Sequence, residues 1–213
     1  MLSSRTDRAG RRAAALVGAA ALAVGTLTAS GRGRVLDRSW FRWLNRDRGP
    51  AVDRAFSAIT ELGSIWASAG AALTLAGFGR RREALDAFGA AGTMWLVGQV
   101  VKKAVLRPRP YSELRDIRLL THRPRGTSWP SSHPAVLLAF LTVASRDLDL
   151  SSAAKAGGAA LAGAVGASRV YLGVHYPADV GGGLLLGRAV ADAWTVALSP
   201  RILGTVPAMA VPH

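Results

Sequence analysis

Three short segments of this 213-residue chain hold most of the side chains that can do acid, base or nucleophilic chemistry. The first segment, from Lys102 to Pro110, places a lysine and an arginine seven residues apart. Pro108 and Pro110 predict that a helix ends here and that the chain continues in an extended path. We therefore expect Lys102 on the last helical turn and Arg109 on the extended segment. Two cations would then converge from different backbones, although simple interfacial anchoring also uses basic residues at such places.

The second segment reads W-P-S-S-H-P and ends at Pro134. Small residues ahead of a helix leave backbone N–H groups that face outward and can bind an anion. Ser131 adds a hydroxyl donor, and His133 stands at the same helix start, where it can donate a proton. Ordinary capping of the helix by serine, beside an interfacial histidine, is the alternative interpretation.

The third segment runs from Ser168 to Asp179. Pro177 suits the first position of a helix, which places Asp179 in the first helical turn. From there the carboxylate can reach back to His175, fix its tautomer and leave the other ring nitrogen free as a nucleophile. Arg169 offers a forked, permanently charged donor for phosphate oxygens. A purely structural His–Asp contact is the alternative.

Together these groups form an inventory that suits phosphoryl transfer through a phosphohistidine. Fixed donors stabilise the charge on the transferring group, an oriented base attacks, and an acid protonates the leaving oxygen. Nothing in this inventory requires a metal or another cofactor, and no two histidines have ligand spacing with a carboxylate partner. The chain contains no cysteine, which excludes disulfide scaffolds, thiolate metal sites and cysteine nucleophiles.

The ordered patterns K-x6-R-P, P-S-x-H and S-R-x5-H-x3-D resemble those of the type 2 phosphatidic acid phosphatase (PAP2) superfamily, over roughly residues 55 to 195. This resemblance implies an all-α membrane bundle with His175 as the nucleophile, Asp179 as its orienting partner and His133 as the general acid. It also implies five phosphate-binding residues, namely Lys102, Arg109, Ser131, Ser132 and Arg169. Ser132 departs from the family, which often has glycine at this position. In the family, the residue at this position acts mainly through its backbone N–H.

The elements that must position these residues are apolar and rich in small side chains. Half of the residues are apolar and only 19% are charged, with 27 Lys and Arg against 13 Asp and Glu. The charges are clumped, unlike those of a disordered basic tail or a soluble domain. The apolar runs lie at residues 13–31, 62–79 and 87–101 and, less clearly, at 134–145, 156–168 and 179–199. They predict about six transmembrane helices, with Arg188 and Asp192 paired toward the interior of the bundle.

Residues 36–44 place Leu36, Trp40, Trp43 and Leu44 on one helical face, which predicts a short interfacial helix, or else a loop packed on the bundle. The first apolar run follows a basic leader, so that a cleaved signal peptide is a second interpretation. We divide the chain into residues 1–54 (leader, first span and interfacial segment), residues 55–200 (catalytic membrane domain) and residues 201–213 (tail).

The cations are unequally shared between the two sides of a six-span bundle. Ten lie on the side of the N-terminus and sixteen on the side of the three motifs. The positive-inside rule would place the larger group in the cytoplasm. We predict the reverse, with the site facing the extracytoplasmic side of the plasma membrane. The resemblance implies this topology, and several of the sixteen cations belong to the motifs.

These observations predict a membrane phosphatase of a lipid phosphate or diphosphate. Undecaprenyl diphosphate, as a polyprenyl diphosphate, is favoured over phosphatidate and phosphatidylglycerol phosphate. A lipid phosphotransferase with another acceptor and a non-enzymatic membrane scaffold are the alternatives, while the apolar spans argue against a haloperoxidase. The expected partners are the lipid substrate and membrane lipids, without nucleic acid, because basic segments separated by lipid cannot form one groove. The oligomeric state stays open.

Overall fold

The computed structural model describes residues 3–28 and 31–199, and the predicted tail at 201–213 lies outside these ranges. Helices are the only regular secondary structure within this part of the chain. In order they are α1 (Ser3–Leu27), α2 (Gly31–Leu44), α3 (Pro50–Glu61), α4 (Ile65–Gly77), α5 (Arg81–Ala104), α6 (Pro110–Glu113), α7 (Ser132–Asp147), α8 (Ser152–Tyr171) and α9 (Pro177–Ala193), followed by a π-helical turn (Trp194–Leu198). The predicted all-α class is therefore confirmed.

Local sequence signals fix several of the helix starts. The hydroxyl oxygens of Ser64 and Ser151 accept hydrogen bonds from backbone N–H groups in the first turns of α4 and α8, at 3.0 and 3.2 Å, as N-caps do. Pro50 and Pro177 stand at the first positions of α3 and α9. As predicted, Pro177 places an aspartate in the first turn of α9.

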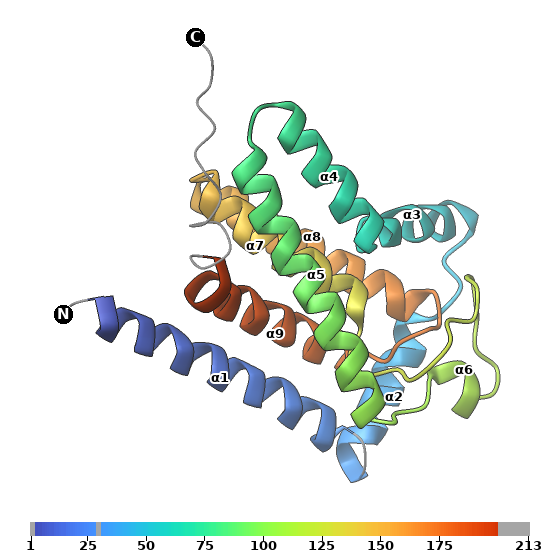
Figure 1. Cartoon of the computed structure of the whole chain (residues 1–213). Coiled ribbons are helices and arrows are strands. Elements are labelled where there is room, and N and C mark those ends of the chain that lie inside the picture. Colours follow the sequence, from blue (N-terminus) through green and yellow to red (C-terminus); the bar gives the residue numbers. More distant parts are fainter. Residues whose placement is uncertain (1–2, 29–30, 200–213) are drawn as a thin grey trace.

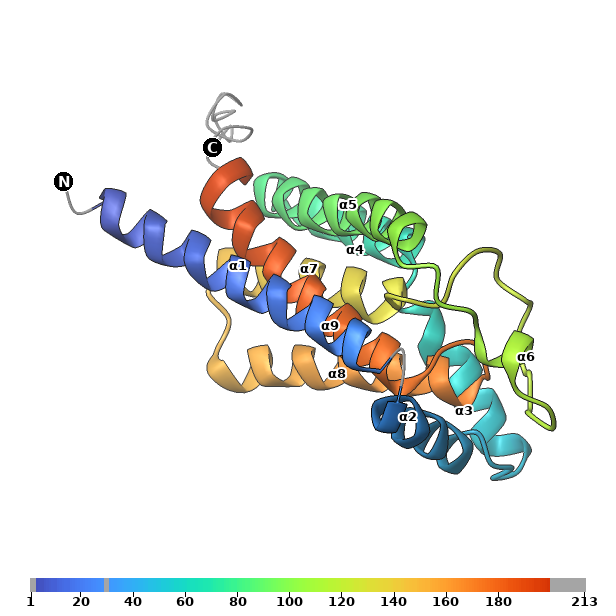
Figure 2. The ribbon, with the colours of Figure 1, turned by 90° about the horizontal axis from the view of Figure 1, so that it is seen from below.

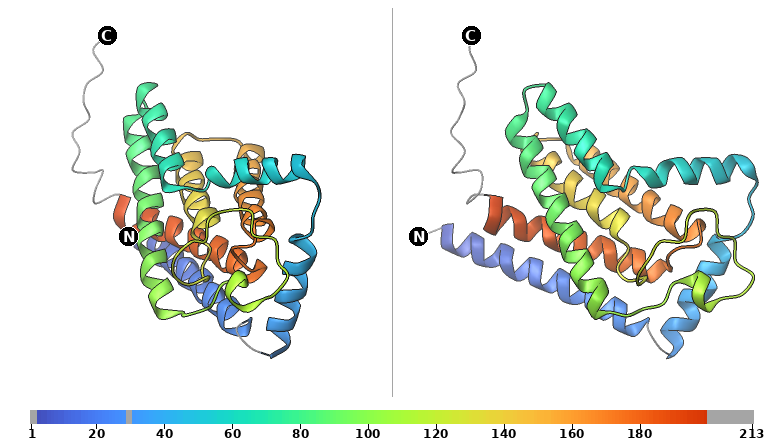
Figure 3. Two further views of the ribbon diagram at one scale, coloured as in Figure 1. Left: turned by 90° about the vertical axis from the view of Figure 1, so that its right-hand side faces the viewer. Right: turned by 45° about the vertical axis from the view of Figure 1, so that its right-hand side comes forward.

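The long helices form a bundle in which α7 packs against α5, α8 and α9 (Figure 1). Helix α1 runs along α9, and α4 pairs with α5, as Figure 2 also shows. One end of the bundle carries α2, α3, α6 and the long connection between α5 and α7. Figure 3 (left) looks onto this end, where the connection crosses in front of the helices. The three motifs all reach this end.

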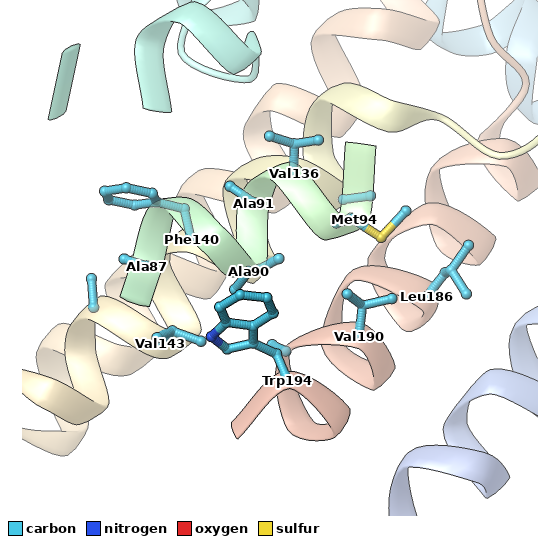
Figure 4. Close-up of a cluster of buried hydrophobic side chains, with 14 of the residues drawn as sticks. Ala87, Ala90, Ala91, Met94, Val136, Phe140, Val143, Leu186, Val190 and Trp194 are labelled. Carbon is cyan, nitrogen blue, oxygen red and sulfur yellow. The ribbon is translucent and has the colours of Figure 1, made fainter. Parts of the chain in front are cut away.

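The core between α5, α7 and α9 combines small residues with a few large ones. Figure 4 shows how alanines of α5 face Phe140 of α7 and Trp194 beyond the end of α9. Glycines bring α9 especially close to α7, because a side chain at Gly183 or Gly187 would collide with the backbone of Ser131 or Ala135. Small residues permit such close packing of membrane helices, and here they hold the start of α9 beside the start of α7.

Adding one methyl group at this contact is expected to destabilise the bundle. A Cβ at Gly187 would lie 2.5 Å from the carbonyl oxygen of Ala135, whereas a Cβ at Gly181 of the same helix meets no atom within 4 Å. We expect Gly187→Ala to lower the free energy of unfolding by about 1–3 kcal/mol. Gly181→Ala has the same change in helix propensity and should cause no loss. Thermal unfolding in detergent compares the two variants, and equal melting temperatures would contradict the packing argument.

Each of the six predicted apolar runs overlaps a helix, namely α1, α4, α5, α7, α8 and α9. By length and apolar composition, only α5 is sufficient to cross a membrane. A second span would be added if residues Ala14–Leu27 and Gly31–Leu44, bent by 88°, act together. These counts apply to the described residues. The number of six crossings therefore stays a prediction.

Two predictions about individual faces have different outcomes. Residues 36–44 lie within helix α2, which confirms the predicted helix over the alternative loop, and Trp40 and Trp43 are 58% and 49% exposed. Its position at a membrane interface stays a prediction. Arg188 and Asp192 are paired at 2.9 Å, as predicted, but the arginine side chain is 57% exposed. The prediction that this pair faces the interior is wrong, because the interior face of α9 is occupied by Gly183, Gly187, Leu186 and Val190.

Candidate active site

His175 lies at the centre of the site, buried in the connection between α8 and α9. Its Nε2 atom is 3.2 Å from Nη1 of Arg109. On the other side of the ring, Nδ1 is 3.4 Å from Oδ2 of Asp179. An arginine can only donate, so Nε2 accepts and the proton of the neutral ring is on Nδ1, facing the carboxylate. The predicted approach of Asp179 to His175 is present, but at 3.4 Å it is not a hydrogen bond, and Nδ1 has no hydrogen-bond partner among the described residues.

Asp179 is held more firmly by other groups than by the histidine. Its Oδ2 accepts hydrogen bonds from the Ser128 hydroxyl and from the backbone N–H of Tyr176, the latter at 2.7 Å. Its Oδ1 accepts from Nη1 of Arg107 at 2.8 Å. The carboxylate is fully buried. A buried carboxylate needs such donors, and they fix its orientation toward His175.

Arg109 lies on extended backbone before α6, as predicted, with φ −82° and ψ 158°. Its guanidinium donates to the carbonyl oxygens of Val174 and Gly126, both at 3.0 Å. These two bonds fix the fork beside the histidine. Burial lowers the pKa of Arg109 from its ordinary value, but an arginine remains protonated.

Two further cations lie close enough to Arg109 to interact with it electrostatically. Lys102 is on the last turn of α5, as predicted, and Arg169 is near the end of α8. Nη1 of Arg169 donates to the Thr60 hydroxyl at 3.0 Å, while its buried Nε has no hydrogen-bond partner among the described residues. His133 faces the same three cations from the start of α7. The structure thus brings all the predicted charged residues together.

The two serines of the second motif lie at the N-terminus of α7. Their hydroxyl oxygens are buried, and within the described part of the chain neither forms a hydrogen bond. The backbone N–H of Ser131 is not free, because it donates to the Asp179 carbonyl at 2.9 Å. Ser132 is the first residue of the helix and is not among the residues with positive φ, so a serine fits where the family often has glycine.

This collection of oriented cations, hydroxyls and two histidines suits an anion such as phosphate. Among residues 3–28 and 31–199, no three His, Asp or Glu side chains are grouped so that they could hold a metal ion. The PAP2 superfamily profile matches residues 83–202, which include all three motifs. The chain belongs to the PAP2 superfamily.

Individual relatives agree with this assignment. An undecaprenyl-diphosphatase from Sulfolobus acidocaldarius is 33% identical over 116 residues, which are 53% of this chain. The match spans only about half (51%) of that relative. The crystal structure of LpxE from Aquifex aeolicus superposes with a TM-score of 0.68 and 28% identity, over 75% of this chain and 94% of LpxE.

A transmembrane PAP2-type phosphatidylglycerolphosphate phosphatase from Bacillus subtilis superposes with the same TM-score of 0.68. It covers 85% of this chain and 94% of that protein, at 23% identity. At this identity the likeness shows the fold alone. Both superpositions show that this chain has the helical architecture of PAP2 proteins.

Sequence reasoning missed several residues that complete this candidate site. Arg107 lies within the first motif segment but received no role there, and Ser128 precedes the second motif. Asp37 lies far upstream, outside the profile match, yet its carboxylate pairs with Arg107. One signal was available for Asp37. It is the single acid in a helix with four arginines, and it shares a helical face with the aromatic Phe41 four residues later.

The cations of the α6–α7 connection do not all face the site. Arg118 is paired with Asp53 at 2.7 Å and also donates to the Tyr171 hydroxyl, so it fastens the connection to α3 and α8. His122 is exposed and lines a cavity of about 490 Å³ with Thr60, Glu61 and Thr121.

The environment of His175 predicts its protonation state. Burial, followed by the charges of Arg109, Lys102 and Arg169, lowers the pKa of His175 well below its ordinary value of 6.5. The ring should therefore remain neutral as the pH falls through 6.5. Because the unfolded chain takes up a proton there, this histidine should make the fold less stable as the pH falls below about 6.5.

Nitrogen NMR of histidine-labelled protein in phosphate-free detergent solution tests this expectation. The His175 resonances are those absent from the spectrum of His175→Asn. We expect them to keep the shifts of a neutral ring at pH values where free histidine in the same buffer is mostly charged. A midpoint near 6.5 would show that the cations do not act on His175 as the geometry indicates.

Proposed function

We propose that this PAP2 protein is an integral membrane phosphatase that hydrolyses a lipid phosphate or diphosphate through a phosphohistidine. The observation that carries the proposal is the buried His175, held between Arg109 and Asp179 with Nε2 as its unprotonated nitrogen. A neutral histidine facing a cluster of cations is suited to attack a phosphorus atom whose oxygens those cations bind. Family membership and the name of the Sulfolobus relative support the same reaction class.

In the proposed reaction, Lys102, Arg109 and Arg169, with the hydroxyls of Ser131 and Ser132, bind the phosphoryl oxygens. Nε2 of His175 forms a bond to phosphorus as the bond from phosphorus to the lipid oxygen breaks. His133 gives its proton to that oxygen, and the lipid leaves. Water then attacks the phosphohistidine and loses its proton to His133, which releases inorganic phosphate and restores the enzyme. A diphosphate substrate would leave as the lipid monophosphate.

The exposed aromatic face of α2 supports a position of the site at the headgroup layer, because tryptophans favour the interface between lipid and water. We propose that α1, α4, α5, α7, α8 and α9 cross the plasma membrane and that the site faces the extracytoplasmic side. In this arrangement the phosphate enters among the cations while the lipid chain remains in the bilayer. Cysteine substitutions at exposed loop positions, labelled with a membrane-impermeant reagent, test this orientation.

A polyprenyl diphosphate such as undecaprenyl diphosphate is the substrate that we favour. The Sulfolobus relative carries the name of that activity, and a diphosphate brings more negative charge to a site with three cations than a monophosphate does. Phosphatidate and phosphatidylglycerol phosphate share the phosphate monoester chemistry. All of these substrates use the same residues, so their rank order has to be measured.

The direct test is phosphate release by the purified protein in detergent, in the presence of a chelator. A polyprenyl diphosphate, a polyprenyl monophosphate, phosphatidate and phosphatidylglycerol phosphate are compared side by side. We expect chelator-resistant release that is fastest with the diphosphate. Release that stops with chelator would contradict the metal-independent mechanism. A folded protein that releases no phosphate from any of these lipids, with or without chelator, would contradict the proposed function.

A further inference from the structure

A buried ion-pair chain connects helix α2 with the proposed nucleophile. Nη2 of Arg107 donates to Oδ2 of Asp37, and Nη1 of the same guanidinium donates to Oδ1 of Asp179 at 2.8 Å. All three side chains are buried, with side-chain exposures of 4% for Asp37, 8% for Arg107 and 0% for Asp179. The order along the chain of contacts is therefore Asp37, Arg107, Asp179 and then His175.

Contacts on several sides hold the guanidinium of Arg107 in one orientation. Its guanidinium lies over the ring of Tyr176, 4.6 Å from the ring centroid, and each terminal nitrogen has its own carboxylate. Asp37 is fixed as well, because its second oxygen accepts the backbone N–H of Ala178 in the first turn of α9, at 2.8 Å. Charge-assisted bonds of a planar fork are strongly directional. The chain therefore transmits the position of Asp37 to the carboxylate of Asp179.

We propose that Arg107 and Asp37 are positioning residues for phosphoryl transfer, a role that rests on the proposed function. Arg107 holds Oδ1 of Asp179, which leaves Oδ2 directed toward Nδ1 of His175, and Asp37 holds Arg107 in that place. Without Arg107, Asp179 would retain the Ser128 hydroxyl and the Tyr176 N–H on one oxygen only. The carboxylate of Asp179 could then rotate away from Nδ1 of His175. The histidine could adopt the tautomer with its proton on Nε2, which cannot attack phosphorus.

The position of Asp37 on helix α2 has a second consequence for the site. Asp37 is on the inward face of α2, whose outward face carries Trp40 and Trp43. The helix that we place at the lipid interface thus contributes, through one carboxylate, to the orientation of the catalytic pair. It does so from outside the region that the PAP2 profile matches.

A double-mutant cycle separates a positioning role from a merely structural one. We expect Asp37→Asn to lower kcat about tenfold or more, as loss of an outer partner of a site residue does, with KM changed by less than about twofold. Asp179→Asn should lower kcat further and leave a residual rate. If Asp37 acts through Asp179, the double variant should be no slower than Asp179→Asn alone.

The control is a partly buried ion pair at the opposite end of the bundle, in which the carboxylate is buried and the arginine side chain is 37% exposed. Asp86 of α5 pairs with Arg146 at 2.6 Å and also accepts from the indole of Trp194. Asp86→Asn should lower the melting temperature, and any effect on kcat should multiply with that of Asp179→Asn. Should Asp37→Asn fail to fold, Arg107→Lys replaces it in the cycle, because it keeps the charge and removes the fork.

The outcomes distinguish this inference from the proposed function. If the wild type is active and the effects of Asp37→Asn and Asp179→Asn on kcat multiply in the double variant, the positioning role is overturned. The phosphatase assignment then remains intact. An unchanged kcat in both Asp37→Asn and Arg107→Lys would do the same. A folded wild type without activity would overturn both. Non-multiplying effects together with an unchanged KM support the chain as described.

Discussion

Replacement of His175 by alanine is expected to abolish phosphate release from every lipid substrate, with a fall in kcat of about 10⁴-fold or more. The remaining cations would still bind the phosphate, but no group would attack the phosphorus atom. His175 is buried, and the two polar contacts of its ring within the described residues are with Arg109 and Asp179. The variant should therefore keep its fold and its elution volume, and lose only the reaction.

His122 provides the matched control, because it is an exposed histidine on the connection between the first two motifs. His122→Ala should keep kcat within about twofold of the wild type, as for most exposed positions away from a site. Reactions with ³²P-labelled substrate, stopped with alkaline SDS, should yield an acid-labile, base-stable phosphoprotein from the wild type and none from His175→Ala. Labelled phosphoprotein in the alanine variant would assign the nucleophile to another residue.

Replacement of His133 by asparagine is expected to have the second largest effect, and one that depends on the leaving group. With a lipid phosphate the departing alkoxide needs a proton, so kcat should fall about 10² to 10⁴-fold. With p-nitrophenyl phosphate the leaving group is a weak base and departs without help. The first turnover should then remain fast, while later turnovers are slow because water still needs His133 as a base.

Stopped-flow measurement of p-nitrophenol is the appropriate test. The asparagine variant should release one equivalent per enzyme rapidly and then a slow steady rate, whereas His175→Ala should show neither phase. Equal losses with both substrates and no rapid first turnover would mean that His133 binds phosphate rather than transferring a proton. That result would also leave the acid of the reaction to be found elsewhere in the site.

The local parts of this structure were predictable because local signals determine them. Pro177 fixes the start of α9 and hence the place of Asp179, and the prolines after Leu106 separate Lys102 from Arg109. The convergence of the motifs followed from their resemblance to a family, not from their spacing. Which glycines of α9 face α7 was not predictable, since Gly181 and Gly183 differ only in their neighbours in space.

The contacts that complete the site were beyond prediction for the same reason. Asp37 and Arg107 are 70 residues apart, and Arg107 and Asp179 are 72 apart. No periodicity or cap relates positions at such separations, so their pairing depends on how the helices dock. The outward position of Arg188 has a similar origin, because hydropathy identifies a charged pair in a span but not the side of the helix that it occupies.

The fully buried Trp129 has a consequence for how the chain can be divided. Trp129 directly precedes the second motif. A Cβ atom at Gly25 of α1 or at Gly182 of α9 would meet its indole, so the side chain is packed between these two helices. A fragment trimmed to the profile-matched region would lose the packing of α1 against Trp129, together with Asp37. The shortest fragment that keeps these contacts therefore begins upstream of the motifs. Chimeras between PAP2 relatives should exchange α1 and α2 along with the region that contains the signature residues.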